Sequence, residues 1–286
     1  CIRDRVNIMD EIEIAFIGGS GLYQVPGLTN IKWKKVSSHF GNPSDKVCIG
    51  LLNSKRVAFL PRHGRKHKLS PSKINYRANI DCLKSLNVKN IISISAVGSL
   101  RSDYKPGDLV LVQQFIDKTF KRDTTFFDND LVAHVQFSQP VCKNLNKISK
   151  QVLKKLKIKF HPTGTYVCIE GPQFSTLAES ELYRSWGCDL IGMTNLPEAK
   201  LAREAGICYA SLAMVTDYDC WHPDHESVTV EAIVKTMEKN SKKALEFIEE
   251  FSKVKNIVCG NSTTNILKDA MTVSYTHLRA HETFGY

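Results

Sequence analysis

The chain has 286 residues, of which 42% are hydrophobic, and its 39 Lys and Arg against 29 Asp and Glu give a formal net charge of +10. This length is enough for one large domain with a filled core, so a second domain is not required. No stretch approaches the ~20 apolar residues of a membrane span, and the first residues hold no apolar signal-peptide core, so we expect neither a membrane protein nor an exported one.

The positive charge favours anionic partners, either polyanions or small phosphates. The basic residues are spread over amphipathic segments such as residues 144–160, "NLNKISKQVLKKLKIKF", where a solvated helix face explains them. No basic block alternates with aromatic residues, and no nucleic-acid module is recognisable. We therefore expect no nucleic-acid partner.

The nine cysteines are an odd number, and no two of them form a CxxC pair of the kind that zinc ribbons and redox motifs use. Cys168 and Cys208 lie within apolar runs, where a reduced cysteine acts as a small hydrophobic residue. This usage predicts a reducing compartment. We expect a cytoplasmic protein, present also in the nucleus if the source is eukaryotic.

Apolar, β-branched runs predict strands, and several are apolar throughout, which indicates burial on both faces. In chain order they are residues 11–19, 56–64, 90–98, 108–116, 164–171, 188–194 and 207–217. Periodic segments predict helices at residues 72–86, 146–157, 176–187, 196–206 and 229–254. The alternation predicts a single α/β domain with a central, largely parallel or mixed β-sheet flanked by helices. Such sheets bind ligands at the carboxyl ends of their strands.

The first predicted strand ends in "FIGGSGL", where Gly18, Gly19 and Gly21 surround Ser20. Glycines permit close backbone approach, and exposed N–H groups beside a hydroxyl can hold a phosphate. The stretch is neither GxGxxG nor a P-loop, because no Lys-Ser/Thr follows it. A plain tight turn explains it equally well.

The next strand ends in "LPRHGRKH", which offers Arg62, His63 and His67. A guanidinium supplies paired charged donors to phosphate oxygens, so Arg62 with His63 suits an oxyanion. A metal site at His63 and His67 is disfavoured because no Glu lies between them and their neighbours are cationic. We prefer an anion site to a merely solvated basic loop.

Three later strand ends carry hydroxyl, aromatic and small residues. "ISISAVGSL" brings Ser95 to a strand end, and "IEGPQFS" could present Phe174 as an aromatic face to a planar ligand. "GMTNLPEAK" ends with Met193 and Thr194 before a helix whose first turn contains Glu198, which is ordinary helix-start chemistry. Each of these could be only a loop, but together they suggest one site.

The last strand ends in "VTDYDCWH", with two carboxylates two residues apart. Side chains alternate along a strand, so Asp217 and Asp219 would point one way and Tyr218 the other. Two carboxyl groups on one side can read a pair of hydrogen-bonding positions on a ligand. Alternatively, the strand becomes polar where it meets water, and the acidic residues cap the following helix.

Five stretches together resemble the trimeric purine nucleoside phosphorylase superfamily, and within it the members that act on S-methyl-5'-thioadenosine. They are "FIGGSGL", "RHGRKH", "PSKINYRANI", "IEGPQFSTLAE" and "MTNLPEAKLAREAGICYASLAMVTDYDCW". The resemblance implies one nucleoside phosphorylase domain over residues 10–273. It also implies a pentosyltransferase that converts S-methyl-5'-thioadenosine and inorganic phosphate to adenine and 5-methylthioribose 1-phosphate in purine and methionine salvage. It implies a homotrimer that uses no metal and no organic cofactor.

The resemblance further implies a role for each site residue. Asp217, helped by Asp219, would read adenine at its 6-amino group and N7 and would stabilise the departing base. The phosphate site would consist of Ser20, Arg62, His63, Ser95, Ala96 and Thr194. The nucleoside would contact Phe174, Ile191, Met193, Thr216, Val230 and Ile233, with His134 contributed by the adjacent subunit.

Two alternatives keep the same fold. One is a purine nucleoside or methylthioinosine phosphorylase, although an ordinary nucleoside needs a polar partner for its 5'-hydroxyl where Val230 and Ile233 lie. The other is a non-catalytic nucleoside-binding protein, which would leave buried phosphate donors unpaired at a cost. Residues 274–286, "SYTHLRAHETFGY", differ in character from the preceding chain and resemble translated adapter sequence, so we expect a non-native tail.

Overall fold

The computed structural model describes residues 12–19, 22, 24–128, 131–223, 230–257, 266–268 and 270, with only the backbone described for residues 230–233. The predicted tail at 274–286 lies outside these residues. Over the described ranges, the strands are β1 (Ile14–Gly18), β2 (Thr29–Lys34), β3 (Val47–Leu52), β4 (Lys55–Pro61), β5 (Asn90–Ser99), β6 (Leu109–Leu111), β7 (Gln114–Lys118), β8 (Phe160–His161), β9 (Thr165–Ile169), β10 (Leu190–Gly192) and β11 (Cys208–Asp217). The helices there are α1 (Tyr76–Ser85), α2 (Lys143–Lys155), α3 (Leu177–Ser185), α4 (Asn195–Glu204) and α5 (Val230–Ser252), with a short 3₁₀ turn at Pro71–Lys73.

These strands form one mixed sheet. Its main path runs β2-β3-β4-β1-β5-β10-β9-β7, and β11 pairs with both β5 and β6. β1 and β11 run parallel to β5, whereas β10 runs antiparallel to it. β10 begins beside the carboxyl end of β5, because Leu190 pairs with Ser99 and Ile191 with Gly98. The predicted α/β fold with a central mixed sheet is confirmed, and the reversal beside β5 is where such sheets bind ligands.

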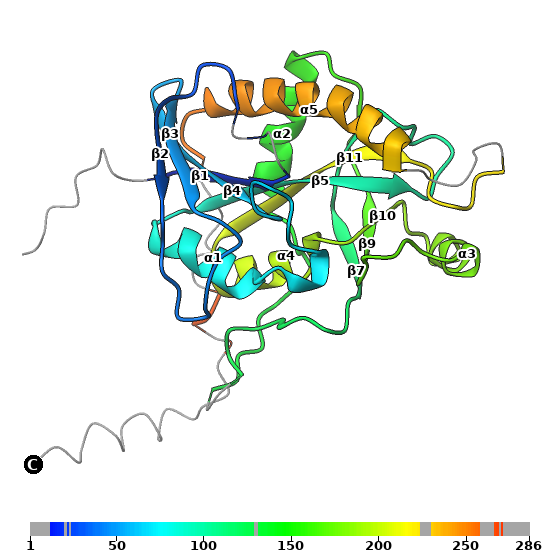
Figure 1. Ribbon diagram of the computed structural model, residues 1–286, viewed down its shortest axis with the longest axis horizontal. Helices are drawn as coiled ribbons and strands as arrows, with labels where there is room; N and C mark the ends of the chain where they lie inside the picture. The colour runs from blue at the N-terminus through cyan, green and yellow to red at the C-terminus, as the bar shows by residue number, and fades with distance from the viewer. Residues whose placement is uncertain are drawn as a thin grey trace, which may run out of the picture.

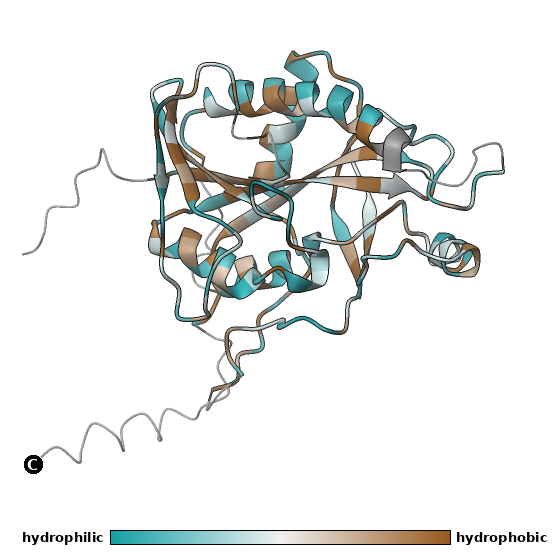
Figure 2. Ribbon diagram, in the orientation of Figure 1, coloured by the Kyte–Doolittle hydropathy of each residue, from teal (hydrophilic) through white to brown (hydrophobic). Residues whose placement is uncertain are grey.

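Helices cover the two faces of the sheet, as predicted. Figure 1 shows α2 and α5 on one face and α1 and α4 on the other, with α3 beyond the β7, β9 and β10 edge. The hydrophobic residues gather in the strands between these layers, and the outward helix surfaces are largely polar (Figure 2). β11 is buried from Cys208 to Thr216, which explains why its sequence is apolar almost throughout.

The structure corrects the strand predicted at residues 108–116. The chain forms β6, paired with β11 and β8, and then β7, paired with β9, so it changes partners within the apolar run. The prediction also lacked β2 and β3. β2 is almost entirely exposed, so no burial pattern marks it in the sequence. Its place is set by pairing with β3 at the edge of the sheet.

Six of the described cysteines, Cys168 among them, carry free thiols. Cys208, in contrast, is disulfide-bonded, which corrects its interpretation as a reduced core residue. No helix in the described ranges is both long and apolar enough to cross a membrane.

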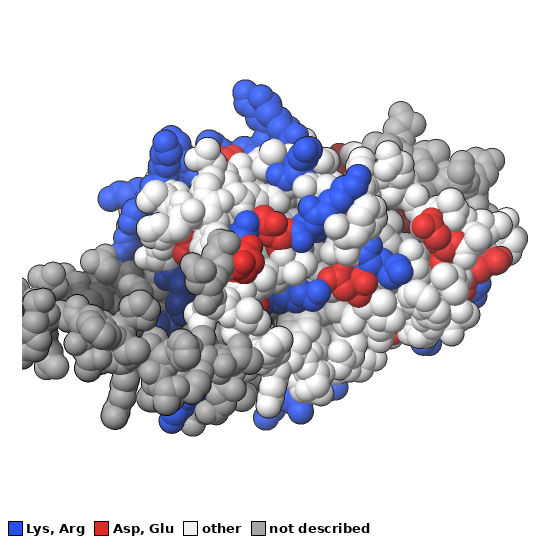
Figure 3. Space-filling view, turned by 90° about the horizontal axis from the view of Figure 1, so that it is seen from below, with Lys and Arg blue, Asp and Glu red and all other residues white. Residues whose placement is uncertain are grey.

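The surface charge is mixed where it can be seen. On the face in Figure 3, acidic side chains lie among the Lys and Arg side chains. A nucleic-acid-binding face would instead gather basic residues in a patch or stripe. This face therefore gives no support to a polyanion partner.

Candidate functional site

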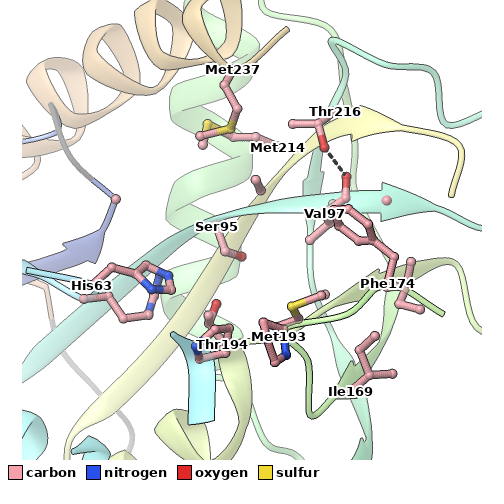
Figure 4. Close-up of a pocket in the computed structure, with 18 of the residues that line it drawn as sticks. His63, Ser95, Val97, Ile169, Phe174, Met193, Thr194, Met214, Thr216 and Met237 are labelled. Carbon is pink, nitrogen blue, oxygen red and sulfur yellow. Dashed lines mark hydrogen bonds between the residues drawn. The ribbon is translucent and has the colours of Figure 1, made fainter. Parts of the chain in front are cut away.

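A cavity of about 590 Å³ lies at the carboxyl ends of β1, β4, β5, β9, β10 and β11. Most of the predicted site residues line it: Arg62, His63, Ser95, Ala96, Phe174, Ile191, Met193, Thr194, Thr216, Asp217 and Asp219. Figure 4 shows His63, Ser95 and Thr194 toward one end and Phe174, Val97 and Thr216 toward the other. The strand ends that were treated separately in the sequence therefore form one site.

The remaining predicted residues do not join them. Ser20 lies outside the described residues, although Gly19 before it lines the cavity. The side chains of Val230 and Ile233 also lie outside the described part. His134 is exposed and does not line the cavity of this chain.

The two carboxylates of the last strand reach the cavity through a turn. β11 ends at Asp217, and Asp219 has a positive φ of 53°, so strand alternation does not extend to it. Instead the Asp219 N–H donates to Asp217 Oδ1 at 2.8 Å, and the Ser175 hydroxyl donates to Asp219 Oδ2 at 2.8 Å. Tyr218 is buried and does not line the cavity, and its hydroxyl donates to the main-chain carbonyl of Ser102.

The surroundings of Asp217 raise the pKa of its carboxyl group. Burial raises its pKa, and the nearby Asp219 charge adds to this, while hydrogen bonds from Thr216 and the Asp219 N–H act in the opposite direction. Thr216 Oγ1 lies 2.6 Å from Asp217 Oδ2 and 3.1 Å from the Val97 carbonyl oxygen (Figure 4). A hydroxyl has one proton to donate. The Thr216 hydroxyl can therefore donate to only one of these two oxygens at a time.

The Arg62 guanidinium is buried beside the opposite end of the cavity. Its Nε and Nη2 donate to the two carboxylate oxygens of Glu198 at 2.8 and 2.9 Å. Nη2 also donates to Ser93 Oγ, and Nη1 to the Ile94 carbonyl oxygen. A guanidinium has five N–H donors, so at most one of them remains for a bound anion. The forked double contact predicted for Arg62 with phosphate is made with Glu198 instead.

The His63 imidazole is neutral near pH 7. Its Nδ1 lies 2.8 Å from the Leu69 carbonyl oxygen, so Nδ1 carries the proton and Nε2 presents a lone pair. Burial lowers the His63 pKa to about 4, and the positive charge of Arg62 contributes to this. Together with the Arg62–Glu198 pair, this leaves neither Arg62 nor His63 with an unbalanced charge.

Comparison with known proteins agrees with this geometry. Residues 13–253 match the family model described as the phosphorylase superfamily. The chain belongs to this superfamily.

The similarity to individual phosphorylases is high. The chain is 53% identical over 240 residues to the S-methyl-5'-thioadenosine phosphorylase of Koribacter versatilis, covering 84% of this chain and 82% of that protein. It is 55% identical over 236 residues to that of Rhodospirillum rubrum, covering 82% and 80%. Among solved structures, a methylthioadenosine phosphorylase from an Antarctic soil metagenomic library matches with a TM-score of 0.88 and 44% identity, covering 93% of this chain and 94% of that one. The resemblance found in the sequence is confirmed.

In this phosphorylase, a buried polar network supports the anion end. Asn195 Nδ2 donates to Ser93 Oγ at 2.9 Å and to the Tyr209 hydroxyl at 2.7 Å, and that hydroxyl donates to Glu198 Oε1 at 2.9 Å. Ser95 Oγ donates to Asn195 Oδ1 at 3.3 Å. The network therefore links the hydroxyl of Ser95 to the ion pair of Arg62.

Sequence reasoning missed the members of this network. It took Glu198 for a helix-start residue, whereas Glu198 is almost fully buried. A signal was present, because Leu201 and Ala202, three and four residues later, belong to the apolar face of α4. A carboxylate on such a face needs a buried partner.

Two methionines also line the phosphorylase cavity without having been predicted. Met214 comes from β11 and Met237 from α5, and they lie near each other in Figure 4. Met237 follows the predicted Ile233 by four residues, so it lies one turn along the same helix face.

No group of three or more His, Cys, Asp or Glu within the described part of the phosphorylase is arranged to hold a metal ion. His63 and His67 stack with ring centroids 4.3 Å apart and planes inclined by 17°. Ring nitrogens of nearly parallel rings do not converge on one ion. Their stacking favours the anion interpretation of this loop.

Proposed function

We propose that the chain catalyses phosphorolysis of S-methyl-5'-thioadenosine to adenine and 5-methylthioribose 1-phosphate. The observation that carries the proposal is the Asp217–Asp219 pair in the same cavity as His63 and Ser95. One carboxylate can accept from the 6-amino group of adenine, while a protonated one donates to N7. The relatives that bear the name of this activity support the assignment.

The proposed reaction breaks the bond between C1' and N9 and forms a bond between C1' and a phosphate oxygen. The bonding electrons leave with the purine, so the sugar becomes oxocarbenium-like and the base negative. Asp217 transfers its proton to N7, for which burial and Asp219 prepare it by raising its pKa. Phosphate stabilises the sugar cation and then attacks it.

We assign the other predicted residues by their place in the cavity. Arg62, His63, Ser95, the Ala96 backbone and Thr194, with Ser20 outside the described residues, would bind phosphate. Phe174, Ile191, Met193 and Thr216 would contact the base and ribose. We further propose that residues 10–273 form the functional unit, and that Val230 and Ile233, with the adjacent subunit's His134 in a homotrimer, would close the 5' end. We expect a cytoplasmic enzyme with inorganic phosphate as co-substrate and no cofactor.

The proposal is tested by phosphate-dependent base release from methylthioadenosine, methylthioinosine, adenosine and inosine in parallel. The full chain and a chain ending at Val273 should both prefer methylthioadenosine. Preference for an inosine compound would favour the purine nucleoside or methylthioinosine alternative and overturn the role of the aspartate pair. Absence of phosphorolysis with all four would favour a non-catalytic nucleoside-binding protein.

Gly98→Ala should lower kcat/KM for methylthioadenosine about tenfold. A methyl group at this position would lie 3.0 Å from Asp217 Oδ1 and 2.9 Å from Ile191 Cγ2. The carboxylate must then shift, and small misplacements of a reacting group are costly. Steady-state kinetics measures the loss. Gly50→Ala, in β3 and away from the cavity, where the methyl group would lie 2.7 Å from Leu28 Cδ1, tests for a general effect of a crowded methyl group. Unchanged kinetics for Gly98→Ala would contradict the role of Asp217.

Sulfate should raise the thermal unfolding midpoint more at about pH 6 than at about pH 8. His63 Nε2 lacks a proton at both values because burial lowers the His63 pKa to about 4. A bound anion raises that pKa, so binding takes up a proton and is favoured as the pH falls. Sulfate keeps its charge over this range, which removes the ionisation of phosphate from the comparison. His63→Gln should respond equally at both values, and an equal response of the wild type would contradict the assignment of His63.

A further inference from the structure

Arg122 is a buried arginine outside the cavity, in the segment after β7. Its side chain is 1% exposed, and Arg122 is not among the described residues that line the cavity. The five N–H groups of the guanidinium lie within hydrogen-bond distance of six oxygens: Glu170 Oε1, the carbonyl oxygens of Ile169, Glu170, Met193 and Leu196, and the Tyr76 hydroxyl. Four of these acceptors are main-chain carbonyl oxygens. Arg122 therefore binds mainly the backbone of neighbouring segments.

Two of those carbonyls, of Glu170 and Met193, belong to loops that build the cavity. The first follows β9 and carries Phe174 and Ser175. The second follows β10 and carries Met193 and Thr194. Nη2 lies 2.7 Å from the Glu170 carbonyl oxygen in the first loop, and Nη1 lies 2.7 Å from that of Met193 in the second. One planar group therefore joins the loop for the base to the loop for the ribose and phosphate.

Glu170 holds the guanidinium in place. Its Oε1 accepts from Arg122 Nε at 3.0 Å, and its Oε2 accepts from the main-chain N–H groups of Phe120 and Lys121. Burial opposes ionisation of Glu170, but a hydrogen bond from the Ser72 side chain together with these bonds outweighs it and lowers the Glu170 pKa to about 2. Glu170 is thus a carboxylate at neutral pH, and it fixes both the segment after β7 and the arginine within it.

The contact with Met193 also orients a peptide group of the site. The Met193 carbonyl accepts from Arg122, so in a trans peptide the Thr194 N–H points the opposite way, toward the Tyr166 hydroxyl at 3.4 Å. Met193 and Thr194 are the residues assigned to ribose and phosphate. Rotation of this peptide would move both assigned contacts.

We propose that Arg122 is a positioning residue for phosphorolysis, which holds the Phe174–Ser175 loop and the Met193–Thr194 loop in their reactive arrangement without touching either substrate. The inference rests on the proposed function. A lysine would not replace it, because one ammonium cannot reach two loops and a carboxylate with the planar geometry of a guanidinium. Sequence reasoning had no signal for it, since Arg122 lies in a polar segment between predicted elements.

The test uses Arg122→Ala and Arg122→Lys in the full chain, with KM measured separately for methylthioadenosine and phosphate. Both variants should lose about 10²-fold in kcat/KM, the loss expected for misplacement of groups at a site by about 1 Å. Guanidinium chloride at millimolar concentrations should restore activity to Arg122→Ala and not to Arg122→Lys, whose ammonium occupies the space. Arg101→Ala and Arg101→Lys are the matched controls, because Arg101 makes its forked contact with Asp103 at the surface.

The outcomes separate this inference from the function itself. An inactive wild type would refute the proposed function, whereas adenine binding measured by calorimetry would still report on the loops in each variant. Activity of both Arg122 variants within twofold of the wild type would overturn the inference. That result would make Arg122 dispensable. A loss of activity in folded Arg122→Ala that guanidinium does not restore would also overturn the inference, as would failure of both variants to fold. Either result would give Arg122 a general structural role.

Discussion

Asp217→Asn should lower kcat for methylthioadenosine phosphorolysis by about 10² to 10⁴, the usual contribution of a positioned general acid. The amide keeps the size of the carboxyl group and can still accept from the Asp219 N–H, which lies 2.8 Å from Asp217 Oδ1. It cannot transfer a proton to N7. Steady-state kinetics with saturating phosphate should therefore show a larger loss in kcat than in adenine binding.

The pH dependence provides an independent check. The Asp217 pKa is raised by burial and by Asp219, so the protonated form persists to higher pH than in an ordinary aspartate. Wild-type kcat should decline as the pH rises through this raised pKa, and the decline should be absent in Asp217→Asn. Asp103→Asn, at an exposed carboxylate, is the control. A kcat for Asp217→Asn within threefold of the wild type would overturn the general-acid role.

Glu198→Ala should reduce the free energy of unfolding by about 3–5 kcal/mol, the cost of removing one partner from a buried ion pair. The Arg62 and Glu198 side chains are 2% and 1% exposed, and the arginine would keep its charge without a carboxylate. Urea unfolding measures the loss. Asp103→Ala, which breaks an exposed pair with Arg101, should cost only about 0–1 kcal/mol.

Anions should stabilise Glu198→Ala more than they stabilise the wild type. Removal of Glu198 frees two guanidinium positions, Nε and Nη2, beside the proposed phosphate site. Phosphate or sulfate should therefore recover part of the lost stability, and more of it than these anions add to the wild type. Equal stabilisation of both proteins would mean that Arg62 does not face the bound anion, and the assignment of Arg62 would then be wrong.

Much of the fold was accessible from local patterns. Buried strands such as β5 and β11 are apolar over most of their length, and α2 and α5 repeat their apolar residues with a helical period. Short stretches of sequence therefore indicate which residues are buried. Parallel sheets bind ligands at strand ends, which directed attention to His63, Ser95 and Asp217 before any contact was known. The exposed β2 carries no such pattern and was missed.

The partners of the site residues were decided only by the tertiary structure. Arg62 and Glu198 lie 136 residues apart, and Arg122 lies 71 residues from Met193, so no local period links them. Asp219 enters the cavity through a turn with positive φ rather than through strand alternation. Periodicity along the sequence records whether a side chain is buried, because burial depends on which face of an element it occupies. The pairing of charged groups depends on how segments distant in the sequence pack together. The assembled sheet determines that packing.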